Sequence, residues 1–214
     1  MSKRNVIVAT LGVVALLVAG GLMASNMGFK LNYVLNGPGS SASGTNTVGL
    51  PFNQQVGLND AKNLIDDINA TSPGSVVNVQ QFDNATDALV LYDGTGGTAF
   101  PINSAEGYFV LVNTDVNYIV VGSHDPGLSV VLNGPTSSAS GTNFYSVPYH
   151  TTNSDAKGLI DEINGASAGS VVNVQQFNNG SDALVLYDGT GGTAFSLVPG
   201  ESYFVLVNTD VSFV

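Results

Sequence analysis

The chain has 214 residues, of which 43% are hydrophobic and only 10% are charged. Its 16 acidic and five basic residues give a formal net charge of -11, and two of the bases lie within the first four positions. Because phosphate binding requires clustered lysine or arginine, this distribution excludes a nucleic-acid-binding protein. The absence of cysteine excludes disulfides and thiolate metal sites.

Residues 1–24 have the pattern of a secretory signal peptide. Lys3 and Arg4 precede an uncharged apolar run from Val6 to Ala24, after which the chain returns to polar sequence. Because this run is close to the roughly 20 residues that span a bilayer, a retained membrane anchor is the alternative. In both cases the rest of the chain is expected outside the cytoplasm, in contact with a membrane only through this segment.

The remainder consists of two copies of one unit. The stretch Val34–Asn46 recurs with one change as Val131–Asn143, and Asp87–Phe100 recurs unchanged as Asp182–Phe195. A period of about 95 residues is too long for a solenoid unit and matches a small domain. We therefore expect a first repeat at residues 28–123 and a second at 128–214, joined by a turn-rich hinge at 124–127.

Each repeat is predicted to contain several short strands and one helix. An opening strand (29–35 and 128–132) leads through a Gly- and Ser-rich loop to a short strand that ends at a proline. Apolar residues at helical spacing then predict an amphipathic helix in each copy. Further strands are expected at 76–82, 88–92, 107–113 and 116–121, with counterparts in the second repeat. The fold class is therefore mainly β, with two tandem β-sandwich-like domains.

The acidic residues argue against a single catalytic centre. Fourteen of the 16 form seven matched pairs between the repeats: Asp60/Asp155, Asp66/Asp161, Asp67/Glu162, Asp87/Asp182, Asp93/Asp188, Glu106/Glu201 and Asp115/Asp210. Duplicated carboxylates belong to the design of the repeat. His124 and His150 have no histidine counterpart, and no nucleophile-elbow motif accompanies them. We expect no enzyme activity and no cofactor.

A glycine-rich loop offers the best candidate for a metal site. It runs from Asp93 to Thr98 and recurs from Asp188 to Thr193. Glycines allow backbone carbonyls and a carboxylate to converge on Ca²⁺, with Asp93 and Asp188 as ligands. The alternative is a plain hairpin turn between two strands, which the lack of further spaced acids favours.

Three turn segments carry the sequon for N-glycosylation. The acceptor residues are Asn69, Asn84 and Asn179. They matter only in a host that modifies them.

The strand around Pro199–Asn208 and the tandem arrangement resemble the β-domains of bacterial and archaeal surface and filament proteins. This resemblance covers both repeats and implies a role at the cell surface. It names no ligand.

These observations predict a self-assembling extracellular protein. The chain ends about where a further copy would begin, and its front supplies a strand that could complete a neighbour. We expect head-to-tail homopolymers in a filament or layer, with the donated strand contributing Phe29, Leu31, Tyr33 and Leu35. The alternative is a secreted carbohydrate-binding or adhesin module that uses Tyr92, Tyr108, their counterparts and the Gly-rich loops.

Overall fold

The structure is a computed structural model that describes residues 28–50, 52–54, 57–123, 128–149 and 151–213. The predicted leader, the hinge at 124–127, His124 and His150 lie outside these residues. No helix in the described part is long and apolar enough to cross a membrane.

The first repeat contains seven strands and one helix in its described residues. They are β1 (Gly28–Leu35), β2 (Thr45–Gly49), β3 (Asn53–Gln54), α2 (Ala61–Thr71), β4 (Val76–Asp83), β5 (Ala88–Tyr92), β6 (Gly107–Val112) and β7 (Val116–Ser123). The second repeat follows the same order with β8 (Val130–Leu132), β9 (Thr142–Ser146), α3 (Ala156–Ala166), β10 (Val171–Asn178), β11 (Ala183–Tyr187), β12 (Ser202–Val207) and β13 (Val211–Phe213).

The strands form four small antiparallel sheets, so the predicted mainly β fold is confirmed. The two larger sheets have the matching orders β2-β6-β4-β5 and β9-β12-β10-β11. The smaller sheets are β1-β7-β3 in the first repeat and β8-β13 in the second. β1 and β7 pair over eight residues, whereas β8 and β13 pair over three.

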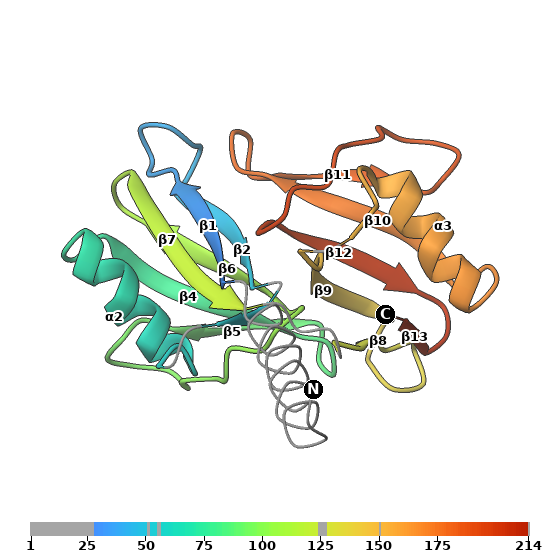
Figure 1. Ribbon diagram of the computed structural model, residues 1–214, viewed down its shortest axis with the longest axis horizontal. Coiled ribbons are helices and arrows are strands. Elements are labelled where there is room, and N and C mark those ends of the chain that lie inside the picture. Colours follow the sequence, from blue (N-terminus) through green and yellow to red (C-terminus); the bar gives the residue numbers. More distant parts are fainter. Residues whose placement is uncertain (1–27, 51, 55–56, 124–127, 150, 214) are drawn as a thin grey trace, which may run out of the picture.

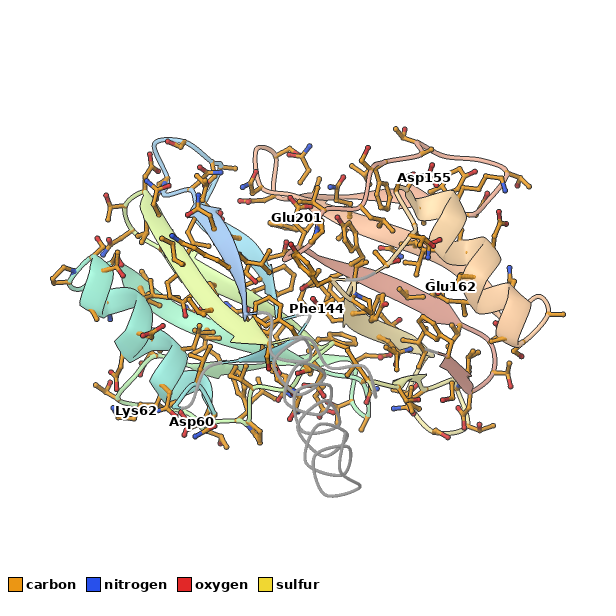
Figure 2. All side chains as sticks on the ribbon, viewed as in Figure 1. Asp60, Lys62, Phe144, Asp155, Glu162 and Glu201 are labelled. Atoms are coloured by element: carbon orange, nitrogen blue, oxygen red, sulfur yellow. The ribbon has the colours of Figure 1, made fainter. Side chains whose placement is uncertain are left out.

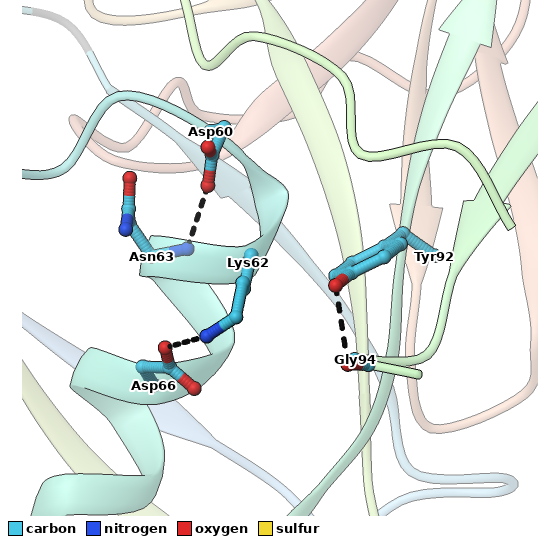
Figure 3. A network of polar contacts seen from close by, with 6 residues as sticks. All are labelled: Asp60, Lys62, Asn63, Asp66, Tyr92 and Gly94. Carbon is cyan, nitrogen blue, oxygen red and sulfur yellow. Dashed lines mark hydrogen bonds and ion pairs between the residues drawn. The ribbon is translucent and has the colours of Figure 1, made fainter. Parts of the chain in front are cut away.

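Both helices form where the apolar spacing predicts them. Ala61, Leu64, Ile65 and Ile68 are buried on one face of α2, and the equivalent residues of α3 are buried too. The carboxylate of Asp60 accepts the backbone N–H of Asn63 at 2.8 Å, which satisfies an amide of the first turn (Figure 3). Asp155 accepts from Gly158 at the same distance. The helices contact β4 and β7 in the first repeat and β10 and β13 in the second.

Each repeat has its own hydrophobic cluster among the described residues. In the first, Tyr33 and Leu35 of β1 pack with Tyr118 of β7, and the rings of Tyr33 and Tyr118 stack with centroids 6.0 Å apart. In the second, Leu132 and Phe213 take part in a separate cluster under α3. The repeat detected in the sequence is therefore also a repeat in packing.

The two repeats lie side by side, with their helices at opposite outer ends (Figure 1). Strands β2 and β6 of the first contact β9 and β12 of the second. We call this contact the inter-repeat junction, and the residues between it and the helices form the two cores.

Candidate functional site

Five phenylalanines fill the inter-repeat junction. Phe144 lies in the middle of the molecule (Figure 2) and stacks on Phe109 and Phe204, with centroids 4.8 and 4.4 Å away. Phe82 meets Phe204 edge to face at 5.4 Å, and its counterpart Phe177 meets Phe109 in the same way at 5.3 Å. Aromatic pairs of this geometry add to the stabilisation that their burial provides.

Backbone hydrogen bonds repeat across the junction with approximate two-fold symmetry. The N–H of Gly49 donates to the carbonyl of Gly200 at 2.7 Å, and the equivalent Ser146 donates to Ala105 at 2.9 Å. At the rim, Ala42 donates to Asn179 at 2.9 Å and its counterpart, Ala139, donates to the Asn84 carbonyl at 2.8 Å. The backbone contacts thus follow the pattern of an isologous dimer, although the side chains of the two faces are not all the same.

The junction is flanked by two grooves that occupy equivalent places. One, of about 480 Å³, lies between β1 and the end of β10, and the other, of about 560 Å³, lies between β8 and the end of β4. Their lining includes Gln176 and Glu201 in the first groove and Gln81 and Glu106 in the second. The first groove therefore holds one carboxylate among amide side chains, and the second holds two, Glu106 and Asp83.

The glutamate in each groove accepts hydrogen bonds from neutral donors. Glu106 accepts from the hydroxyl of Tyr108 at 2.9 Å, from Gln81 at 3.2 Å and from Asn103 at 3.1 Å. Glu201 accepts from Tyr203 at 3.1 Å and from Gln176 at 3.3 Å. These contacts position a hydrogen-bond acceptor in each groove, with a tyrosine hydroxyl among its donors.

The tyrosine hydroxyls in these clusters remain protonated. Burial, with a contribution from Glu106, raises the pKa of Tyr108 far above its usual value, and burial and Glu201 act likewise on the pKa of Tyr203. Their rings are fully buried. They serve as neutral hydrogen-bond donors within the fold and cannot stack on a ligand, which removes two of the aromatic residues considered for sugar binding.

The glycine-rich loop forms a turn closed by its own aspartate. Oδ1 of Asp93 accepts the N–H groups of Gly96 at 2.6 Å and Thr95 at 2.8 Å, and these bonds lower the pKa of the carboxyl. Asp188 makes the equivalent bonds in the second repeat. The described residues contain no group of three or more His, Asp or Glu side chains that could hold a metal ion. Calcium binding by Asp93 and Asp188 stays a prediction.

The strand predicted for donation is paired inside its own repeat. β1 pairs with β7 of the same chain from Gly28 to Leu35, so Phe29 lies opposite Gly122. The side chains of Tyr33 and Leu35 are buried, and Leu31 packs partly against the same core. The hydroxyl of Tyr33 also donates to the carbonyl of Gly49 at 2.6 Å. Donation to a neighbour would therefore require β1 to exchange partners between chains.

Two of the three sequon asparagines belong to the junction. Nδ2 of Asn84 donates to Asn143 at 3.3 Å, and Nδ2 of Asn179 donates to Asn46 at 3.4 Å. The atom that a glycan would occupy is thus turned toward the opposite repeat. Asn69 lies on α2, where its Oδ1 accepts the N–H of Val76 at 3.1 Å.

Comparisons with known proteins identify no relative of this chain. A search against protein-family models, curated proteins and solved structures found no match for the chain. Its function is therefore argued from its own residues.

Proposed function

We propose that the chain is an extracellular structural protein, a subunit that associates with copies of itself in a surface filament or layer. In this proposal residues 1–24 direct export, and the repeats are two tandem β-sandwich-like domains. The observation that carries it is a pair of exposed leucines that occurs once in each repeat.

The leucine pair lies on the outer strand of each larger sheet. Leu89 and Leu91 of β5 are 49% and 43% exposed, and Leu184 and Leu186 of β11 are 49% and 42% exposed. β5 and β11 are edge strands, paired on one side only with β4 and β10. Apolar side chains that stand together on a soluble surface mark sites of association.

Duplication of this surface makes the subunit bivalent. Because both repeats carry the identical sequence from Ala88 to Tyr92 and from Ala183 to Tyr187, each subunit offers two equivalent apolar sites. Two sites on one subunit allow contacts to propagate through successive copies without closing. Only 10% of the residues are charged, so few charges have to be buried in such a contact, but the net charge of -11 makes subunits repel one another most at low ionic strength.

Strand donation through β1 is a second route to the same assembly. β1 lies at the edge of its sheet, so one side of its backbone has no strand partner in the described part of the chain. A neighbouring strand could add along that side, or β1 could exchange between chains. Only the exchange moves Tyr33 and Leu35 out of the core of their own repeat.

The test is the particle size of the protein that begins at residue 25, measured by light scattering across a range of concentrations. We expect growth with concentration and its loss in the variant Leu89→Ser, Leu91→Ser, Leu184→Ser, Leu186→Ser. The comparison variant is Ile119→Ser, Val121→Ser, which removes an equally exposed apolar pair from β7 and which we expect to leave the growth unchanged, because the proposal assigns assembly to the duplicated leucines alone. Deletion of residues 25–36 removes β1 together with the buried Tyr33 and Leu35, so it tests the contribution of β1 only in protein that circular dichroism shows to be folded. A protein that is monomeric at every concentration, with or without these changes, contradicts the proposal.

A carbohydrate-binding or adhesin role is the second candidate, and the two grooves favour it. Their amide and carboxylate side chains are suited to the hydroxyl groups of a neutral sugar. Glycan-array binding that is lost in Gln81→Ala, Gln176→Ala and kept in the leucine variant would favour this role over assembly.

A further inference from the structure

Three residue pairs at the centre of the junction differ in size between the repeats. Thr47 in β2 corresponds to Phe144 in β9, Gly49 corresponds to Ser146, and Gly107 in β6 corresponds to Ser202 in β12. Some neighbouring residues match, as in the pairs Asn46/Asn143, Tyr108/Tyr203 and Phe109/Phe204, whereas others differ, as in Val48/Tyr145 and Ala105/Gly200. The smaller member of each of the three central pairs belongs to the first repeat.

The glycines of the first repeat make room for the serines of the second. A Cβ atom on Gly49 would lie 2.1 Å from Oγ of Ser146 and 2.7 Å from Oγ of Ser202. A Cβ atom on Gly107 would lie 2.6 Å from Cβ of Ser202 and 2.8 Å from the ring of Phe144. These separations are shorter than side-chain contacts tolerate, so serine cannot occupy both sides of the contact.

Phe144 fills the space that Thr47 leaves open. Its side chain is buried between Phe109 of the first repeat and Phe204 of the second. A threonine at this place has no ring to stack on either neighbour. The large side chain at the centre of the junction thus comes from the second repeat alone.

The two serines also stand out by their hydroxyl groups. Ser146 and Ser202 are 0% and 1% exposed, and neither Oγ atom has a hydrogen-bond partner. Burial of an unpaired hydroxyl is unfavourable, and a glycine or alanine would avoid it. We explain the two serines by the space that their side chains fill. This space is available only because the opposite face carries glycine.

We infer that these three pairs make the junction selective for unlike repeats. Two faces of the second-repeat type would bring serine against serine and collide, and two faces of the first-repeat type would leave the centre unfilled. The partner of each face is therefore the opposite face, carried by the same chain or by a second copy. Contacts formed through this face between chains join a first repeat to a second repeat, which is a head-to-tail arrangement.

The experiment uses the full chain with residues 124–127 replaced by a protease-cleavable sequence, which is cut after folding. Native mass spectrometry over a dilution series then measures which halves remain together. We expect only 1:1 pairs of unlike halves. The variant Gly49→Ser, Gly107→Ser should weaken pairing at least about tenfold, and adding Ser146→Gly, Ser202→Gly, Thr47→Phe, Phe144→Thr should restore it to within about threefold.

Each outcome bears on the inference directly. Like pairs of comparable abundance, an undiminished glycine-to-serine variant, or a lack of restoration in folded protein would overturn it. If the glycine-to-serine variant does not fold, the sixfold exchange of all three pairs decides, because it keeps the same side chains and only moves them across the junction. Failure of that exchange to fold and pair also overturns the inference. The leucines of the proposed assembly surface are not changed in this experiment, so the two proposals can fail separately.

Discussion

Asp115 is hydrogen-bonded to Gly37 across 78 residues of the sequence: its Oδ1 accepts the N–H of Gly37 at 2.8 Å. Its Oδ2 accepts the hydroxyl of Ser40 at 2.6 Å. Asp210 binds Gly134 and Ser137 in the same way. In both repeats this aspartate ties the start of the last strand to the loop that follows the opening strand.

These bonds predict a loss of stability in acid. Donation by Ser40 and Gly37 lowers the pKa of Asp115 below its usual value, and donation by Ser137 and Gly134 lowers that of Asp210. A carboxyl whose pKa is depressed by folding stabilises the protein above its unfolded pKa, and this contribution is lost as the pH falls through the folded value. We expect the melting temperature to drop below about pH 4.

The double variant Asp115→Ala, Asp210→Ala tests whether these two carboxylates cause the loss of stability in acid. It should melt below the wild type at pH 6 and approach it at pH 2.5, because protonation removes the same interactions from the wild type. Parallel melting curves at all pH values would assign the acid sensitivity to other carboxylates, of which Asp93 and Asp188 also have lowered pKa values.

Removal of a helix cap should destabilise both repeats to a similar extent. Asp60→Ala and Asp155→Ala each leave a first-turn amide without its acceptor, at a cost of about 1 kcal/mol in the free energy of unfolding. Urea denaturation measures this cost. The control is Lys62→Ala, which removes an exposed pair with Asp66 (Figure 3) and should change stability little. An equal effect of the control would refute the role of the cap.

Loss of a buried tyrosine hydroxyl should leave groups in the core without partners. In Tyr108→Phe the backbone N–H of Asn103 loses its acceptor, 2.8 Å away, and Glu106 loses a donor. We expect a loss of about 1 to 3 kcal/mol. The equivalent change Tyr203→Phe removes the acceptor of Val198 and should cost about the same, because the two clusters match. Calorimetry of both variants tests this symmetry, and a loss confined to one repeat would contradict it.

The local features of this fold could be predicted from the sequence, and the long-range ones could not. Both helices follow from apolar spacing and a capping aspartate, all within about ten residues. The partner of β1 is a strand more than 80 residues away, so no local pattern identifies β7. The sequence predicts the position of the opening strand correctly. It does not show that Tyr33 and Leu35 of this strand pack in the core of their own repeat.

The junction was missed for a different physical reason. Phe144 and Thr47 lie on the face of a sheet that points away from the core of its own repeat, and Phe144 is buried because a second sheet packs against it, whereas Thr47 is only partly buried. The available signal was the small set of differences between matched repeats, namely Gly49/Ser146 and Gly107/Ser202. Without the strand pairing, nothing in the sequence places these differences at one point in space.

The aromatic centre of the junction gives the largest predicted effect. Phe144→Ala removes a buried ring from between Phe109 and Phe204, and the surrounding strands can close this space only in part. We expect a loss of about 3 to 5 kcal/mol in the free energy of unfolding, measured by urea denaturation. The control Val131→Ala removes a side chain that is 60% exposed on β8 and should cost less than about 0.5 kcal/mol.

If the two repeats unfold together in the wild type, Phe144→Ala should also separate the unfolding into two transitions, because it weakens their coupling without touching either repeat's own cluster. A single transition with an unchanged midpoint would mean that the junction adds little to the stability of the chain.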